Sequence, residues 1–139
     1  MFTQSRSSAQ SMSGIYRNLQ VDTGVGTASR HRLVGMLFEG FFDACCQARG
    51  HLETGNVEQK CRSLVRAARI VDEGLKARLD VQAGGELAGN LNDLYAYIGV
   101  RLTHANLHND AAAIEECQHL LRPVQSAWNQ IGAQVDATR

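Results

Sequence analysis

The stretch RLVGMLFEGFFDACCQARGHL, residues 32–52, holds the pattern on which the fold of this chain depends. Its apolar residues recur at steps of three and four, which places them along one face of an α-helix. They are Leu33, Met36, Leu37, Phe41, Ala44, Cys45, Ala48 and Leu52. We therefore expect a helix from about residue 30 to residue 53, with Ser29 as its N-cap and Gly55 as its C-cap.

The same periodicity returns three times on the C-terminal side of this helix. Asn56 and Gln59 resemble a capping box, which predicts that a second helix begins after Asn56. This helix is expected to end near Gln82. A third helix ends near His108, and the Asn109-Asp110 pair leads into a fourth. The three apolar stripes are Val57, Cys61, Leu64, Ala68, Val71, Leu75 and Leu79; Leu87, Leu91, Leu94, Ile98, Leu102 and Ala105; and Ile114, Cys117, Leu121, Val124, Trp128, Ile131 and Val135.

No segment shows the sustained two-residue alternation of a strand. Residues 1–28 are rich in Ser, Thr, Gln and Gly, with a weak apolar patch at Met12, Ile15, Tyr16, Leu19 and Val21. We expect an all-α protein: an antiparallel four-helix bundle of residues 29–139, preceded by a mobile N-terminal arm of residues 1–28.

Several residues that disfavour helix lie inside the expected helices. A glycine within an exposed helix costs about 1 kcal/mol relative to alanine. Either these glycines let helices pack closely, or they line a groove where another chain approaches the backbone. Pro123 removes a backbone donor from the fourth helix and should kink it near His119 and Leu120. The glycines concerned are Gly35, Gly40, Gly74, Gly89 and Gly99.

The composition disfavours several classes of function. The chain has 139 residues and a mass of 15.2 kDa, with 14 basic and 14 acidic residues. Nucleic-acid binding is disfavoured because it usually needs a basic excess, and no apolar run is long enough for membrane insertion. The N-terminus lacks a secretory signal pattern, and the four cysteines contain no C-x-x-C motif. We expect reduced thiols and a cytoplasmic location.

The sequence offers little that points to catalysis, a metal or a cofactor. His104 and His108 lie one helical turn apart, but no H-E-x-x-H motif accompanies them, so we interpret them as a solvated pair near a helix C-terminus. A single Glu-x-x-His spacing, Glu116 to His119, has no second copy of the kind that di-iron bundles require. No phosphate-binding glycine loop is present. We expect a protein that is not an enzyme and has no cofactor.

The stretches GGELAGNLNDLYAY, residues 84–97, and RLTHANLHND, residues 101–110, resemble two consecutive blocks of one family, the flagellar secretion chaperones of the FliS family. The first is similar to the GGEIAxNLxxLYxYM block of that family. Further similarities lie at YRNLQVDT (residues 16–23), LVGMLFEG (33–40), IVDEGLK (70–76) and Ala127-Trp128. The sequence departs from the family pattern at Gly35, at Gly99-Val100 and at Pro123.

The resemblance implies a cytoplasmic export chaperone for flagellin. Such a protein binds the disordered C-terminal segment of flagellin, prevents premature polymerisation and assists delivery to a component of the flagellar export gate. In the family, the flagellin tail wraps around the bundle in partly helical pieces, and the N-terminal arm of the chaperone can cover part of the binding surface. A monomer or a weak dimer would be compatible with this function.

The residues expected to bind the partner are Tyr16, Leu64, Ala68, Val71, Asn90, Tyr95, Tyr97 and Asn106. Tyr16 either docks over the bundle and yields to flagellin or is a permanent part of the core. Tyr95 and Tyr97 lie two residues apart on a helix, so one should be buried and the other available. Asn106 should bond either to a loop or to the partner's backbone. Leu64, Ala68 and Val71 could belong to the core or to a groove.

Two other functions remain open from the sequence. The chain could be a helical-bundle adaptor or regulator that binds an amphipathic helix of another partner, unrelated to flagella. A metalloenzyme built on a bundle is the weaker alternative, because its ligand motifs are missing.

Overall fold

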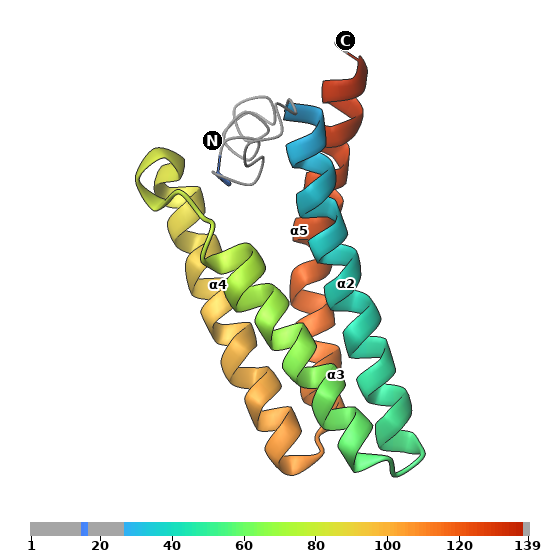
Figure 1. Ribbon diagram of the computed structural model, residues 1–139. Coiled ribbons are helices and arrows are strands. Elements are labelled where there is room, and N and C mark those ends of the chain that lie inside the picture. The colour runs from blue at the N-terminus through green and yellow to red at the C-terminus, as the bar shows by residue number, and fades with distance from the viewer. Residues whose placement is uncertain (1–14, 17–26, 138–139) are drawn as a thin grey trace.

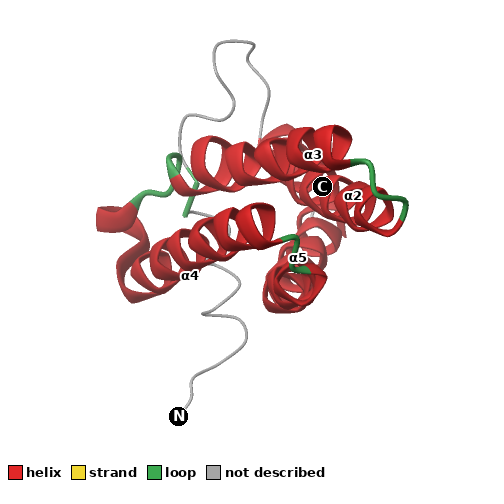
Figure 2. Cartoon of the chain, turned by 90° about the horizontal axis from the view of Figure 1, so that it is seen from below, coloured by secondary structure: helices red, strands yellow, loops and turns green. Residues whose placement is uncertain are grey.

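The computed structural model describes residues 15–16 and 27–137. It contains the α-helices α2 (Thr27–Glu53), α3 (Val57–Arg69), α4 (Val81–His108) and α5 (Ala111–Ala137), and a π-helix, η1 (Ile70–Lys76), directly continues α3. Consecutive helices run in opposite directions (Figure 1). Seen end-on, they follow one another around the bundle, with α3 diagonally opposite α5 (Figure 2). The expected all-α antiparallel four-helix bundle is confirmed.

The short connections follow the capping chemistry of the sequence. Asn56 caps α3 by accepting a hydrogen bond from the backbone N–H of Gln59 at 3.2 Å. Gly55 has a positive φ of 76°, the backbone conformation expected of a glycine that ends a helix. Asn109 ends α4 with φ 52° and ψ 48°, and the Asp110 carboxylate accepts from the backbone N–H groups of Ala112 and Ala113. These caps hold the two loops at one end of the bundle.

The core face of α2 agrees with the expected stripe from Phe41 to Ala48 and differs from it near the N-terminal end of the helix. Val34 and Phe38 are fully buried, whereas Leu33 and Met36 are 40% and 58% exposed. The expectation that Leu33 and Met36 belong to the core was therefore wrong, because α2 carries apolar residues on more than one face. The remaining core residues of this helix are Phe41, Ala44, Cys45 and Ala48.

The second helix is shorter than expected. It ends at Lys76 instead of near Gln82, and Asp80 caps α4 by accepting from the N–H of Ala83 at 3.0 Å. The turn between the two helices therefore precedes Gly84 and Gly85. Gly85 instead interrupts the helical geometry inside α4, with φ 60° and ψ −138°. The apolar steps of three and four continue through η1, so the pattern could not indicate the change to i→i+5 hydrogen bonding.

Of the five glycines expected inside helices, Gly40 and Gly74 have the expected close-packing role. A Cβ on Gly74 would lie 3.0 Å from the Leu37 side chain, and one on Gly40 would lie 3.2 Å from Ile70, so both allow α2 to approach the α3–η1 helix closely. Gly35, Gly89 and Gly99 have no neighbouring atom within 4 Å of such a Cβ. Pro123 lies inside α5, which continues as one helix on both sides of it.

The expected boundary between arm and bundle, at residues 28 and 29, lies close to the start of α2 at Thr27, and the proposed cap Ser29 falls inside that helix. The mobility of the arm concerns residues that lie almost entirely outside the described ones. Before the start of α2, Ile15 and Tyr16 are the arm residues that the structure describes, and both are buried.

Candidate functional site

Ile15 and Tyr16 pack into the end of the bundle where η1 passes into α4. The carbonyl oxygen of Ile15 accepts a hydrogen bond from the backbone N–H of Asp80 at 2.6 Å. Tyr16 forms an antiparallel bridge with Leu79, the residue just before Asp80. Ile15 also contacts α4, because a Cβ on Gly84 would lie 3.2 Å from its side chain. Ile15 and Tyr16 thus make their backbone contacts with the short turn between η1 and α4.

The ring of Tyr16 lies between α4 and α5. Its hydroxyl shares a hydrogen bond of 2.5 Å with the hydroxyl of Tyr95, and its ring meets Trp128 edge-on, with 5.5 Å between the centroids. All three side chains are about 1% exposed. Burial raises the pKa of both phenols well above the usual value of 10, so both stay neutral at physiological pH. Tyr16 therefore links the arm to two helices at once.

Trp128 in turn joins α5 to α2. Its indole N–H donates to the backbone carbonyl of His31 at 2.9 Å, and the His31 ring stacks on the indole with 4.7 Å between centroids. The same imidazole forms a hydrogen bond with the backbone carbonyl of Trp128. Gly132, one turn further along α5, leaves the space that this imidazole occupies.

Three of the expected partner-binding residues are mainly core residues. Leu64 and Val71 are each 1% exposed, and Ala68 is partly buried against the same core. Between the two interpretations that the sequence left open, the structure therefore favours core over groove for Leu64 and Val71.

Asn106 is occupied by a bond inside the bundle. The ammonium group of Lys60, which is 1% exposed, donates to both the backbone carbonyl and the side-chain Oδ1 of Asn106, at 2.8 Å each. These bonds join α3 to α4 and satisfy a buried charge. Of the two alternatives for Asn106, a bond to a loop or to the partner's backbone, the first is wrong, because its side chain bonds to a helix. Nothing in the sequence pattern indicated a role for Lys60, a buried residue of α3.

Tyr97 and Asn90 lie on the surface of α4. Tyr97 is 45% exposed, and its hydroxyl donates to Glu116 of α5 at 2.6 Å. Arg101 donates to the other oxygen of the same carboxylate at 2.8 Å. The hydrogen bonds from Tyr97 and Arg101 hold the pKa of Glu116 below its ordinary value. The expectation that one of Tyr95 and Tyr97 is buried and the other available agrees with these positions.

An apolar hollow lies over the outer face of α3 and η1. It has a volume of about 720 Å³. We call it the arginine groove, and its lining consists of Leu37, Cys61, Arg62, Val65, Arg66, Arg69, Ile70, Glu73, Gly74 and Arg78. The sequence pattern did not predict this groove, because only the apolar stripe of the second helix was assigned a role. The combination of arginines with Val65 and Ile70 on one face was the available signal.

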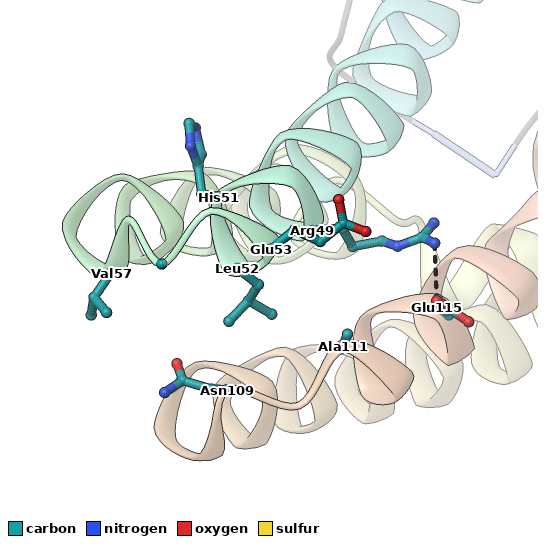
Figure 3. A pocket seen from close by; sticks show the side chains of 9 residues that line it. Arg49, His51, Leu52, Glu53, Val57, Asn109, Ala111 and Glu115 are labelled. Carbon is teal, nitrogen blue, oxygen red and sulfur yellow. Dashed lines mark hydrogen bonds and ion pairs between the residues drawn. The ribbon is translucent and has the colours of Figure 1, made fainter.

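A second hollow of about 420 Å³ lies at the other end of the bundle, where the two loops meet (Figure 3). Arg49 of α2 points across it to Glu115 of α5 at 2.9 Å. Leu52 points toward the loop that carries Asn109 and Ala111, whereas His51 points away from it. The ion pair joins the walls of this hollow, and only Leu52 and Val57 supply large apolar side chains to it.

The histidines and cysteines form no cluster suited to a metal. His104 bonds to Asp110 at 3.1 Å and its ring lies 4.6 Å from that of His108, but nowhere in residues 15–16 and 27–137 do three such ligand types gather. The four thiols are free. Burial raises the pKa of Cys117 to about 12, which makes this thiol unreactive. Within the same described ranges, no helix has the length and apolarity that crossing a bilayer requires.

Comparison with known proteins gives a consistent result. The family model of flagellar protein FliS matches residues 12–135. The flagellar secretion chaperone FliS of Salmonella typhimurium is 49% identical over 116 residues, which cover 84% of this chain and 86% of that protein. The corresponding chaperone of Escherichia coli is 38% identical over 83% of this chain and 85% of its own length. FliSB of Pseudomonas aeruginosa is 38% identical over 84% and 91%.

Proposed function

The chain belongs to the FliS family of flagellar secretion chaperones, and on that premise we propose that it is the export chaperone of a flagellin. It binds the C-terminal segment of the flagellin, which is disordered when free, and keeps the subunit from polymerising before export. It then assists delivery of the subunit to the flagellar export gate. The protein acts in the cytoplasm as a monomer or weak dimer and catalyses no reaction.

The observation that carries this proposal is the apolar surface outside the core. Eight large apolar side chains are exposed on the described helices, from 40% for Leu33 to 74% for Leu107. Such surface commonly marks an interaction site when it is contiguous. The eight are distributed over three of the four helices, which suits a partner that contacts the bundle at several places: Leu33, Met36, Val57, Val65, Val81, Tyr97, Val100 and Leu107.

A guest that folds only when it binds has to offset the loss of its own conformational entropy. A contact spread over several helices supplies the buried area for this, because each additional apolar contact adds to the binding free energy. Amphipathic helices are the guests that grooves on a helical bundle accept most readily. We therefore expect the flagellin tail to become partly helical on the bundle.

The expected partner-binding residues differ in whether flagellin could contact them directly. Tyr97 and Asn90 are accessible to a partner, whereas Leu64, Val71 and Tyr95 could be reached only if the bundle opened or the arm moved. Displacement of Ile15 and Tyr16 would uncover Tyr95 and Trp128 between α4 and α5. This supports the hypothesis that the arm covers part of the binding surface and competes with flagellin.

Arm truncation tests this part of the proposal. Removal of residues 1–11 should leave the rate of flagellin binding unchanged, whereas removal through Leu19 should speed association of the isolated flagellin tail. Stopped-flow fluorescence measures both rates, and the shorter deletion is the matched control. Slower association of the longer deletion would mean that the arm is part of the binding site and not its cover.

Seeded polymerisation tests the chaperone function itself. Filament growth from flagellin seeds is followed by light scattering with an equimolar amount of the chain, or of serum albumin as a control. The proposal requires that the chain suppress elongation and that albumin leave it unchanged. Unchanged elongation in the presence of the folded chain would refute it.

A further inference from the structure

The arginine groove combines an apolar floor with an unusual charge. Leu37, Val65 and Ile70 supply large apolar side chains, and Gly74 lets η1 lie close against α2. The apolar surface continues along α2, where exposed Leu33 stands one turn before Leu37. A guest helix with an apolar stripe could therefore bury it along both α2 and the α3–η1 helix.

The rim of the groove is strongly positive. Its lining holds four arginines and a single glutamate, although the basic and acidic residues of the whole chain cancel at 14 each. The arginines are Arg62, Arg66, Arg69 and Arg78.

Existing ion pairs neutralise this charge only weakly. Arg62 pairs with Glu58 at 3.3 Å and Arg69 with Glu73 at 3.4 Å, and all four of these side chains are more than 60% exposed. Pairs of this kind contribute little to stability and can exchange partners. Arg66 makes no ion pair within the part of the chain that the structure describes, and its guanidinium reaches across the groove toward Gly40 of α2.

We propose that the arginine groove binds an amphipathic helical segment of the export client in which Asp or Glu residues flank the apolar stripe. This inference rests on the proposed chaperone function. It adds that negative charge beside the apolar stripe of the client determines which of its segments binds. The apolar floor supplies affinity, and the arginines fix which segment binds and in which orientation, because carboxylates accept paired hydrogen bonds from guanidinium groups. A guest with a neutral or basic flank leaves the arginines unpaired.

Designed peptides test the inference. Three helical peptides of about 18 residues share one leucine stripe at i, i+3, i+4 and i+7 and carry flanking Glu, Gln or Lys. Their affinities for the full chain are measured by fluorescence anisotropy at low salt and again at 0.5 M NaCl. The acidic peptide should bind about fivefold tighter than the neutral one at low salt, and the basic peptide weakest. High salt should reduce the preference to less than about twofold, because it screens exposed charges.

Variants locate the effect on the groove. In Arg66→Gln/Arg69→Gln the preference for the acidic peptide should fall below about twofold, whereas Arg122→Gln on α5 should keep it. Arg78 is left in place because it donates to the Glu73 carbonyl at the end of η1. Circular dichroism and the melting temperature establish that each variant is folded; an unfolded double variant is replaced by Arg66→Gln alone, which breaks no ion pair.

The results separate this inference from the proposed function. Equal affinity for acidic and neutral peptides, no binding of any of the three, or a preference that the groove variants leave unchanged would each overturn the inference. Flagellin binding by the same wild-type sample would leave the chaperone function standing in all three cases. Failure of full-length flagellin to bind would overturn the function instead.

Discussion

Tyr16 and Tyr95, which are 79 positions apart in the chain, share a hydrogen bond between their hydroxyl oxygens at 2.5 Å, inside the bundle. This bond gives the N-terminal arm a specific place in the fold. The Trp128 ring packs against Tyr16, and its N–H donates to the backbone carbonyl of His31. Through these contacts Tyr16 is linked to α2, α4 and α5.

Removing one of the two hydroxyls should destabilise the bundle. Tyr16→Phe leaves the hydroxyl of Tyr95 buried without its partner, which should cost about 1–2 kcal/mol in the free energy of unfolding. The double variant Tyr16→Phe/Tyr95→Phe should cost less than the sum of the two single variants. Urea unfolding of the wild type and of the three variants measures this. Strictly additive effects would show that the two hydroxyls do not interact in solution.

Two glycines should respond to alanine in opposite directions. In Gly132→Ala the new Cβ would overlap the His31 ring, so the variant should lose about 1–3 kcal/mol as α2 and α5 are forced apart. In Gly99→Ala the Cβ meets no atom within 4 Å, and the better helix propensity should stabilise the fold by about 0.5–1 kcal/mol. Thermal unfolding of both variants gives the comparison. A stabilising Gly132→Ala would mean that the His31–Trp128 stack is absent in solution.

Asparagine substitutions should distinguish a structural residue from a surface residue. Asn106→Ala removes one of the two acceptors of the buried Lys60 ammonium and should cost about 1–3 kcal/mol. Lys60→Met in the same background should recover part of this loss, because the buried charge is then gone. Asn90→Ala, on the exposed surface of α4, should change stability by less than about 0.5 kcal/mol. Chemical denaturation measures all three, and equal effects of the two asparagines would contradict the assignment.

The bond between α4 and α5 at Glu116 should depend on pH. Because the pKa of Glu116 is lower in the folded chain than its ordinary value of 4.5, its contribution to stability is present above that value and is lost as pH falls through the depressed pKa. The difference in melting temperature between wild type and Glu116→Gln should therefore be present at pH 7 and should shrink as the pH falls below 4.5 through the depressed pKa. Glu86→Gln, an exposed change on α4, is the control. A difference that persists unchanged at pH 3 would show that the charge of Glu116 is not responsible.

The apolar periodicity of the sequence was sufficient to predict the helices and the four-helix bundle. It could not assign the core residues at the N-terminal end of α2, because Leu33 and Val34 are both apolar and only the position of the neighbouring helices buries Val34. The transition to η1 at Ile70 was equally hidden, since the apolar steps continue through it.

The candidate site was harder to predict than the fold. The sequence identified Tyr16 and Tyr95 separately, but their contact depends on the path of the arm. The arginine groove requires Leu37 of one helix beside Ile70 of the next, a pairing that appears only when the helices pack. Lys60 stayed unnoticed because a buried lysine is uncommon, and its acceptor lies 46 positions away at Asn106.

The most direct test of the chaperone function is a calorimetric titration of two flagellins into the full chain, one intact and one lacking its C-terminal segment. The proposed function requires that the intact flagellin bind and that the truncated one give no measurable heat of binding. Circular dichroism of the intact mixture should also show more helix than the sum of its components. Equal binding of both flagellins, or of neither, would contradict it.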